Sequence, residues 1–318
     1  MLIEECVKEK INDFLSGLGL GRAVLVCTDN IKDLLTDTIR EIGIETANDS
    51  EIGRIKDFDF AIAAGGGKTI DLVKHESYKL GKPWVSFPTI LSHDGIVSSR
   101  ASFKRNGARI SVQASEPFAI IADLGLIKKA PKRWIASGAG DLISNISAVE
   151  DWKIADRAGR EKYHTLIGEL ALLSSKSVVA HAEDIKRMDS HGLEVLLWSL
   201  ICSGFAMNIY GSSRPCSGSE HNFAHSLDML DERVLHGEAC ALGTVVSTYL
   251  QNGNWQNIKA VMEKMGLPTT AQEINIGKEV LIEALVKAKS IRDRYTILNE
   301  KEITQEKAEA ILRDVGII

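Results

Sequence analysis

The chain has little of what membrane-spanning, disulfide-bonded or nucleic-acid-binding proteins need. No apolar run approaches the ~18 uninterrupted residues of a membrane span. The five cysteines, at 6, 27, 202, 216 and 240, show no CxxC spacing. The formal net charge is −5, and no basic stretch offsets it to favour a nucleic-acid partner. The N-terminus, MLIEECVKEKINDFL, is acidic and amphipathic, unlike a signal peptide. We therefore expect a reduced, cytoplasmic protein without a membrane span.

The 318 residues change pattern near Ala130-Pro131. Before that point, apolar runs typical of buried strands alternate with helical segments, which predicts a doubly wound, mainly parallel, Rossmann-like sheet. The predicted strands are 22–28, 58–65, 82–89 and 118–127, and the predicted helices are 2–18, 30–43 and 69–81. Residues 101–113 predict a hairpin that turns at Asn106-Gly107.

After residue 130 nearly the whole chain has the 3.6-residue periodicity of helices. The sequence thus predicts an α/β nucleotide-binding domain over 1–130 and a helical metal- and substrate-binding domain over 131–318. We expect the ligand site in the cleft between the two.

A glycine-rich bend, AIAAGGGKTIDLV at 61–73, is the first stretch that indicates chemistry. Three glycines end an apolar run, and a predicted helix follows Lys68 and Thr69, so free N–H groups and a positive helix end attract phosphate. Ile62 stands where the triphosphate-cleaving G-x-x-x-x-G-K-[ST] loop needs its first glycine, and G-x-G-x-x-G is absent. The bend favours a cofactor pyrophosphate over a nucleoside triphosphate or a purely structural turn.

A second polar stretch, SFPTILSHDGIVSSRASF at 86–103, follows the next strand. Ligands of open α/β sheets bind at the carboxyl ends of strands, where this segment is expected to lie. It carries hydroxyl donors and His93-Asp94-Gly95. The alternative is a polar loop with an Asp-Gly turn.

Three of the eight histidines lie within sixteen residues. His221 and His225 are four apart, hence on one helical face, and His236 precedes a glycine. Asp141, in SGAGDLISN, offers a carboxylate, and two imidazoles with one carboxylate would make a three-ligand, open metal site. The alternative for each histidine is a packed or solvated role. The spacing is not HExxH, and Cys216 fits a small buried residue better than a ligand.

Taken together, the motifs GGGKTID, FPTILSHDGIVS, SGAGDLISN, GSEHNFAHSLD, LHGEACALG and RDRYTIL resemble one family. They are similar, in this order, to the archaeal sn-glycerol-1-phosphate dehydrogenases, which are grouped with iron-dependent alcohol dehydrogenases, glycerol dehydrogenase and 3-dehydroquinate synthase. The resemblance implies NADH- or NADPH-dependent reduction of dihydroxyacetone phosphate to sn-glycerol 1-phosphate, with one divalent metal, zinc, in archaeal ether-lipid synthesis. It also implies a homo-oligomer.

The resemblance assigns residues to roles. It implies Asp141, His221 and His236 as metal ligands, and His225 and Asp94 as catalytic residues that face the substrate. The cofactor residues that it implies are Gly66, Gly67, Lys68, Thr69, Ile70, Asp71, Thr89, Ile90, Leu91, Ser92 and Ser98.

For the substrate phosphate, Arg214 is the first candidate, and Lys104 and Arg109 are alternatives. Asn145 stands where iron alcohol dehydrogenases place a fourth, histidine ligand, which favours a three-residue, zinc-type site. The remaining alternatives are a glycerol dehydrogenase, a dehydroquinate synthase-like enzyme and, in another class, a P-loop-like nucleotide hydrolase.

Overall fold

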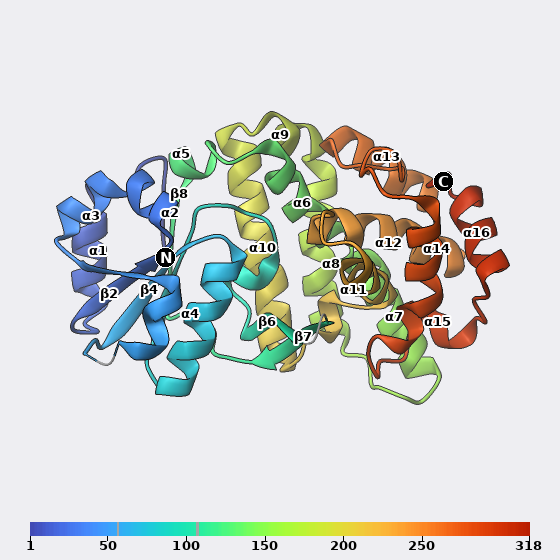
Figure 1. Ribbon diagram of the computed structural model, residues 1–318, viewed down its shortest axis with the longest axis horizontal. Helices are drawn as coiled ribbons and strands as arrows, with labels where there is room; N and C mark the ends of the chain where they lie inside the picture. Colours follow the sequence, from blue (N-terminus) through green and yellow to red (C-terminus); the bar gives the residue numbers. More distant parts are fainter. Residues whose placement is uncertain (56, 106–107) are drawn as a thin grey trace.

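The protein consists of a parallel sheet followed by a helical region (Figure 1). Its structure is a computed structural model that describes residues 1–55, 57–105 and 108–318. In these ranges the main sheet has six strands: β1 (Leu2–Glu4), β2 (Ala23–Cys27), β3 (Glu45–Asn48), β4 (Phe60–Gly65), β5 (Trp84–Pro88) and β8 (Ala119–Asp123). All neighbouring strands are parallel, in the order β1-β8-β5-β4-β2-β3. The predicted parallel sheet is confirmed.

Both faces of the sheet are buried at its centre, which explains why the central strands β2, β4, β5 and β8 are mainly apolar. Along β2, Val24 and Val26 pack into the core shared with the helical region, whereas Leu25 and Cys27 pack into a second core on the opposite face. The sheet region also contains α1 (Ile11–Gly17), α2 (Asp29–Leu34), α3 (Thr36–Ile42), α4 (Gly67–Leu80), α5 (Leu124–Ile127) and the 3-10 helices η1 (Asp49–Arg54) and η2 (Asp94–Ile96).

The helix predicted over 2–18 is wrong in its first half. Leu2–Glu4 forms β1 and pairs with Ile121–Asp123 of β8, and the helix covers only Ile11–Gly17. The Val7 N–H donates to the Asp123 carboxylate at 3.1 Å, which fixes the chain beyond β1. The helix predicted over 30–43 divides at Leu35 into α2 and α3, and β3 was not predicted. Local apolar spacing did not reveal pairing with a strand more than a hundred residues away.

The predicted hairpin is present as β6 (Arg100–Arg105) and β7 (Ala108–Gln113), which pair antiparallel. The turn predicted at 106–107 lies outside the described residues. The hairpin leaves the sheet region, and β7 contacts α11 (Ser219–Leu230) of the helical region.

From Lys132 onward the described elements are helices. They are α6 (Lys132–Ile143), α7 (Asn145–Arg157), α8 (Thr165–Ala180), α9 (Ala182–Arg187), α10 (Ser190–Tyr210), η3 (Arg214–Cys216), α11, α12 (His236–Leu250), α13 (Trp255–Met265), α14 (Lys278–Lys287), η4 (Ala288–Ser290), α15 (Ile297–Glu300) and α16 (Gln305–Asp314). Helix α10 is long and apolar enough to cross a membrane, but 61% of its apolar window is buried inside the protein, as in a core helix.

A buried lysine joins α4 to the segment between η2 and β6. Lys74 of α4 is fully buried. Its ammonium group lies 3.0 Å from the Asp71 carboxylate and donates to the carbonyls of Gly95 and Arg100 at 2.5 and 2.7 Å. One buried cation therefore ties α4 to both ends of the segment between η2 and β6.

Replacing Lys74 by Met is expected to lower the free energy of unfolding by about 3–5 kcal/mol, because the buried Asp71 carboxylate loses its cation. The matched control is Lys79→Met on the same helix. Lys79 is 54% exposed and pairs with Glu76, so its loss is expected to cost less than about 1 kcal/mol. Urea unfolding measures the free energy of unfolding of both variants. Equal losses would contradict a stabilising role for the buried contacts of Lys74.

Candidate active site

The glycine bend connects β4 to α4 and is hydrogen-bonded to the loop after β5. Strand β4 ends at Gly65, whose carbonyl accepts the Thr89 N–H at 3.0 Å, and α4 begins at Gly67. A Cβ on Gly67 would lie only 1.8 Å from His93 Nε2, so a larger residue cannot occupy this position with the imidazole in place. His93 Nδ1 accepts the Gly95 N–H at 2.9 Å, which leaves the proton on Nε2, over the first turn of α4.

The residues predicted to hold the cofactor do not all face the same way. Lys68 is exposed at the first turn of α4, and Thr69 is buried with its hydroxyl 3.2 Å from Asp49. The Ile70 side chain packs in the core, and Asp71 accepts the Ser102 N–H at 2.9 Å. The side chains of Ile70 and Asp71 thus contact protein.

The segment after β5 adds buried hydroxyl groups next to the bend. Thr89, Ser92 and Ser98 are buried, as is Leu91, and Ile90 is half-buried. The Ser98 hydroxyl donates to the Arg100 carbonyl at 3.3 Å, but the Thr89 hydroxyl has no hydrogen-bond partner among the described residues. A buried, unpaired hydroxyl beside a helix N-terminus fits a ligand with acceptor oxygens, such as a pyrophosphate.

Glycines let α6 and α12 approach closely. A Cβ on Gly140 of α6 would meet the Gly237 carbonyl at 2.4 Å, and one on Gly237 would meet the Ser137 carbonyl at 1.7 Å. The Gly237 N–H donates to the Ser137 hydroxyl at 3.1 Å. This contact sets Asp141, the next residue of α6, beside His236, the first residue of α12.

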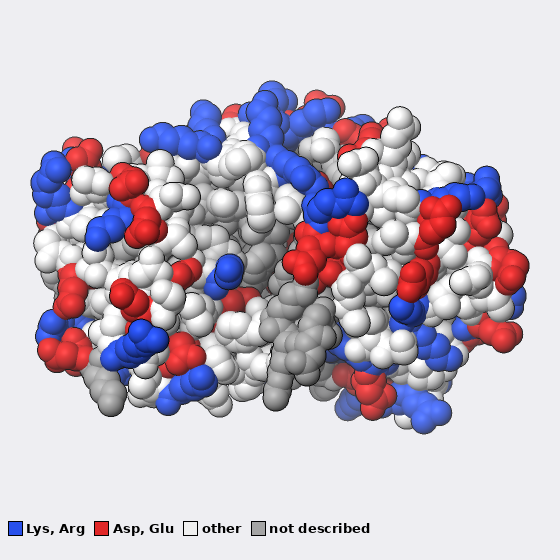
Figure 2. Space-filling view, viewed as in Figure 1, with Lys and Arg blue, Asp and Glu red and all other residues white. Residues whose placement is uncertain are grey.

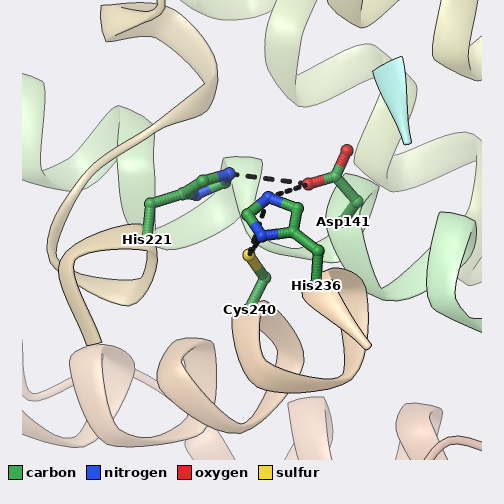
Figure 3. Close-up of side chains that lie close together, drawn as sticks. All are labelled: Asp141, His221, His236 and Cys240. Atoms are coloured by element: carbon green, nitrogen blue, oxygen red, sulfur yellow. Dashed lines mark hydrogen bonds and ion pairs between the residues drawn. The ribbon is translucent and has the colours of Figure 1, made fainter. Parts of the chain in front are cut away.

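Asp141, His221 and His236 converge on one point from three helices, α6, α11 and α12 (Figure 3). Asp141 Oδ1 lies 3.5 Å from His221 Nε2 and 3.6 Å from His236 Nε2. Donor atoms within 4.8 Å of one another could share one metal ion. The three residues predicted as ligands are therefore brought together, and one carboxylate with two imidazoles is a donor set that suits a divalent transition metal.

The charges of this cluster shift the pKa values of its two aspartates. Burial alone would raise the pKa of Asp141, but the hydrogen bond from His221 and the charge of His236 outweigh it and lower that pKa to about 2. Burial and the nearby Asp141 charge raise the pKa of Asp94 to about 7. The pKa values of these two adjacent carboxyl groups are thus shifted in opposite directions.

His225 and Asp94 lie at the edge of the cluster. The His225 ring stacks on that of His236, with centroids 5.6 Å apart. The Asp94 N–H donates to Asp141 Oδ2 at 3.1 Å, and Asp94 Oδ2 accepts the Ser203 hydroxyl at 2.7 Å. Both residues predicted to face the substrate therefore adjoin the predicted metal ligands.

Sequence analysis missed two members of the site. Glu220 Oε1 lies 2.9 Å from His221 Nδ1, which fixes the ring so that Nε2 points toward Asp141. Cys240 is buried one turn after His236, and its sulfur lies 3.6 Å from His236 Nε2 (Figure 3). The four-residue spacing between His236 and Cys240 would have indicated this proximity.

Arg214, the first candidate for the substrate phosphate, is fully buried. Its guanidinium donates to the carbonyls of Asp151 and Tyr295 at 2.9 and 3.0 Å and lies 3.1 Å from Glu161, while its Nη1 has no hydrogen-bond partner among the described residues. Its role as a phosphate ligand stays a prediction. The side chains of the alternatives, Lys104 and Arg109, lie outside the described residues. Asn145 is buried and donates to Ser174 and Ser203, consistent with a site that lacks a fourth histidine.

The molecular surface is hollowed between the sheet region and the helical region, with Lys and Arg side chains above the hollow (Figure 2). The loop after β5 connects the two sides. A Cβ on Gly138 of α6 would lie 2.0 Å from the Leu91 carbonyl, so this loop packs directly on the helix that carries Asp141.

Comparison with known proteins gives relatives over nearly the whole chain. The chain is 41% identical to the glycerol-1-phosphate dehydrogenase [NAD(P)+] of Pyrococcus horikoshii, over 98% of this chain and 95% of that protein. It is 48% identical to the enzyme of that name from Pyrococcus furiosus, over 81% of this chain and 75% of that protein. Residues 2–131 match the family model described as iron-containing alcohol dehydrogenase.

Solved structures share the fold at low sequence identity. Glycerol dehydrogenase from Schizosaccharomyces pombe aligns with a TM-score of 0.78 and 18% identity, over 97% of this chain and 86% of that one. Sulfoacetaldehyde reductase from Bifidobacterium kashiwanohense, solved with NAD+, aligns with a TM-score of 0.75 and 16% identity. The alignment covers 99% of this chain and 96% of that one. The predicted fold, a Rossmann-like region followed by helices, is confirmed.

Replacing Gly67 by Ala is expected to displace the His93 imidazole and weaken dinucleotide binding at least about tenfold, or about 1.4 kcal/mol. Gly17→Ala is the control, because nothing lies within 4 Å of a Cβ there. Fluorescence titration with NADH and NADPH gives the dissociation constants.

The double variant Gly67→Ala/His93→Ala tests whether the clash causes the loss. If it does, Gly67→Ala should weaken binding much less in the His93→Ala background than in the wild type. Additive effects of the two changes would show that Gly67 acts independently of His93.

Proposed function

Because this chain belongs to the glycerol-1-phosphate dehydrogenase family, we propose that it reduces dihydroxyacetone phosphate to sn-glycerol 1-phosphate with NADH or NADPH. The reaction supplies a glycerol phosphate backbone for archaeal ether lipids, and we place it in the cytoplasm. The single observation that carries the proposal is the convergence of Asp141, His221 and His236 beside the loop that contacts the glycine bend.

Asp141, His221 and His236 would hold one divalent cation, for which we propose zinc. Support comes from the 3.5 and 3.6 Å separations and from Glu220, which orients His221 as carboxylates orient metal-binding imidazoles elsewhere. When bound, the cation supplies Lewis acidity that favours negative charge on a carbonyl oxygen, and the reduced nicotinamide supplies the hydride.

The chain's own groups would position the substrate and move a proton. His225, stacked on His236, is placed to pass a proton to the oxygen that gains charge when the carbonyl is reduced. Asp94, fixed by the Ser203 hydroxyl and by its own N–H to Asp141, would orient a substrate hydroxyl.

The cofactor pyrophosphate would bind at the N-terminus of α4. The first N–H groups of that helix, at Gly67, Lys68 and Thr69, and the Thr89 hydroxyl are the donors that support this position. Ile70 and Asp71 would contribute by holding α4 in place rather than through side-chain contacts with the cofactor.

The substrate test uses pure enantiomers. Oxidation of sn-glycerol 1-phosphate with NAD+ or NADP+ is expected, with far slower oxidation of sn-glycerol 3-phosphate and of glycerol. Incubation with a chelator should abolish the activity, and added zinc should restore it. Preference for glycerol would indicate a glycerol dehydrogenase. Turnover of neither phosphate would favour a synthase, and ATP hydrolysis with phosphate release would favour a nucleotide hydrolase.

Asp94→Asn is expected to lower kcat by about 10²-fold or more, because it removes a group that contacts the substrate, while bound metal stays stoichiometric. The asparagine oxygen can still accept the Ser203 hydrogen bond, so the fold should persist. Asp141→Ala is the contrasting variant, expected to lose both activity and metal. Steady-state kinetics and metal analysis measure these effects, and metal loss in Asp94→Asn would contradict the separation of roles.

A further inference from the structure

Helix α10 exposes large apolar side chains on one of its faces. It carries no Lys or Arg, and Glu194 is its one acidic residue. A helix that is apolar all round is normally buried on every side. Yet Trp198 is 43% exposed, Phe205 40% and Ile209 66%. One face of α10 is therefore apolar surface that the described part of the chain leaves uncovered.

The uncovered residues lie in a single line along the helix. This line, the α10 stripe, consists of Val195, Trp198, Cys202, Phe205 and Ile209. Its members follow one another at spacings of three, four, three and four residues. That alternation is the a/d pattern of a coiled-coil seam, in which side chains of one helix insert between those of a second. Residues between them, such as Leu196, Leu200 and Ser203, are buried against the protein. The stripe thus has the pattern of a helix-packing surface.

Helix α8 packs along α10 and adds to the exposed apolar surface. It exposes Leu166, at 85%, and Leu173, at 55%. Together with the α10 stripe, these side chains expose on the order of 500 Å² of apolar surface. A stable homodimer takes about 800 Å² from each partner, of which roughly 65% is apolar, so the surface is large enough for a second copy.

The charges near the stripe favour a second copy of this chain over a membrane surface. A helix that lies on an anionic membrane carries Lys and Arg on its polar face, and α10 has neither. On α8, Lys176 is 68% exposed and lies 3.8 Å from Glu169, so the neighbouring charges are balanced. A two-fold dimer requires only that the same surface match itself, which a nearly uncharged stripe does.

We propose that the α10 stripe packs against the α10 stripe of a second copy, with the two helices antiparallel across a two-fold axis. In this arrangement the N-terminal half of one stripe meets the C-terminal half of the other, and the two helix dipoles run in opposite directions. A parallel pair would bring the two copies of Glu194 together, where like charges repel. The assembly goes beyond the proposed reaction and does not rest on it.

Other residues of α10 hold the segment after β5. The Ser203 hydroxyl donates to Asp94 at 2.7 Å, and the Asn208 side chain accepts the Ser99 N–H at 2.7 Å. The same helix therefore contacts the candidate active site on one side and carries the stripe on another. A second copy would brace the helix that positions Asp94.

Sedimentation velocity of the wild-type enzyme and of Ile209→Glu measures the assembly. The wild type is expected to sediment as a dimer or a larger even-numbered assembly. Ile209→Glu should halve that mass or raise the dissociation constant at least about 100-fold, because the two-fold axis brings each new charge into the interface twice. Ile209 is 66% exposed within one chain, so the variant should fold, which circular dichroism checks. The matched control, Leu34→Glu on α2, changes a side chain that is 58% exposed and should leave the mass unchanged.

Labelling of Cys202 locates the interface directly. Once Cys6 is replaced by Ser, Cys202 is the one cysteine that is not buried, and all five lie in the described ranges. Its reaction with N-ethylmaleimide, followed by intact mass, should be at least about tenfold slower in Cys6→Ser than in Cys6→Ser/Ile209→Glu, because thiol reactivity follows exposure.

Two results would overturn the proposal. One is a wild type that sediments as a monomer, or an assembly whose mass and Cys202 labelling are unaffected by Ile209→Glu. The other is flotation of the wild type with phosphatidylserine vesicles that Ile209→Glu abolishes, which would assign the stripe to a membrane surface. The mass of the wild type alone can refute the dimer, so the test holds even where Ile209→Glu does not fold.

Discussion

The site depends on two helices that approach more closely than side chains would permit. Gly140 and Gly237 leave no Cβ where α6 and α12 approach most closely, and a Cβ on either glycine would meet a backbone carbonyl of the other helix. Asp141 and His236 are the residues next to these glycines in the chain, so backbone contact between the two helices sets the distance between them. A separation fixed in this way is what a metal centre needs, since ligand distances tolerate only a few tenths of an ångström.

Buried charge is the second constraint. Asp94, Asp141 and Glu220 place three carboxyl groups close together, and such groups are costly to remove from water without partners. Imidazoles, hydroxyls and backbone N–H groups supply those partners: His221 lies between Asp141 and Glu220, and Ser203 donates to Asp94. A divalent cation would add positive charge where the negative charge is densest.

One loop connects the two halves of the site. The segment after β5 lays His93 over Gly67, directs the Asp94 N–H to Asp141 and packs Leu91 against Gly138. Lys74 holds the far end of the same segment through the Gly95 and Arg100 carbonyls. The position of α4, where we propose the cofactor, is thereby coupled to the position of the proposed metal ligands.

The sequence by itself determined the parallel sheet, the helical second half and the glycine bend, because continuous apolar runs, 3.6-residue periodicity and glycine restrictions are local properties. Together with the family resemblance, it also named the three side chains that converge. Only the tertiary structure decided that Leu2–Glu4 is a strand, that Arg214 is fully buried, and that Glu220 and Cys240 join the cluster. Each of these depends on contacts between segments far apart in the chain or on the direction of one side chain, and spacing along the sequence carries neither.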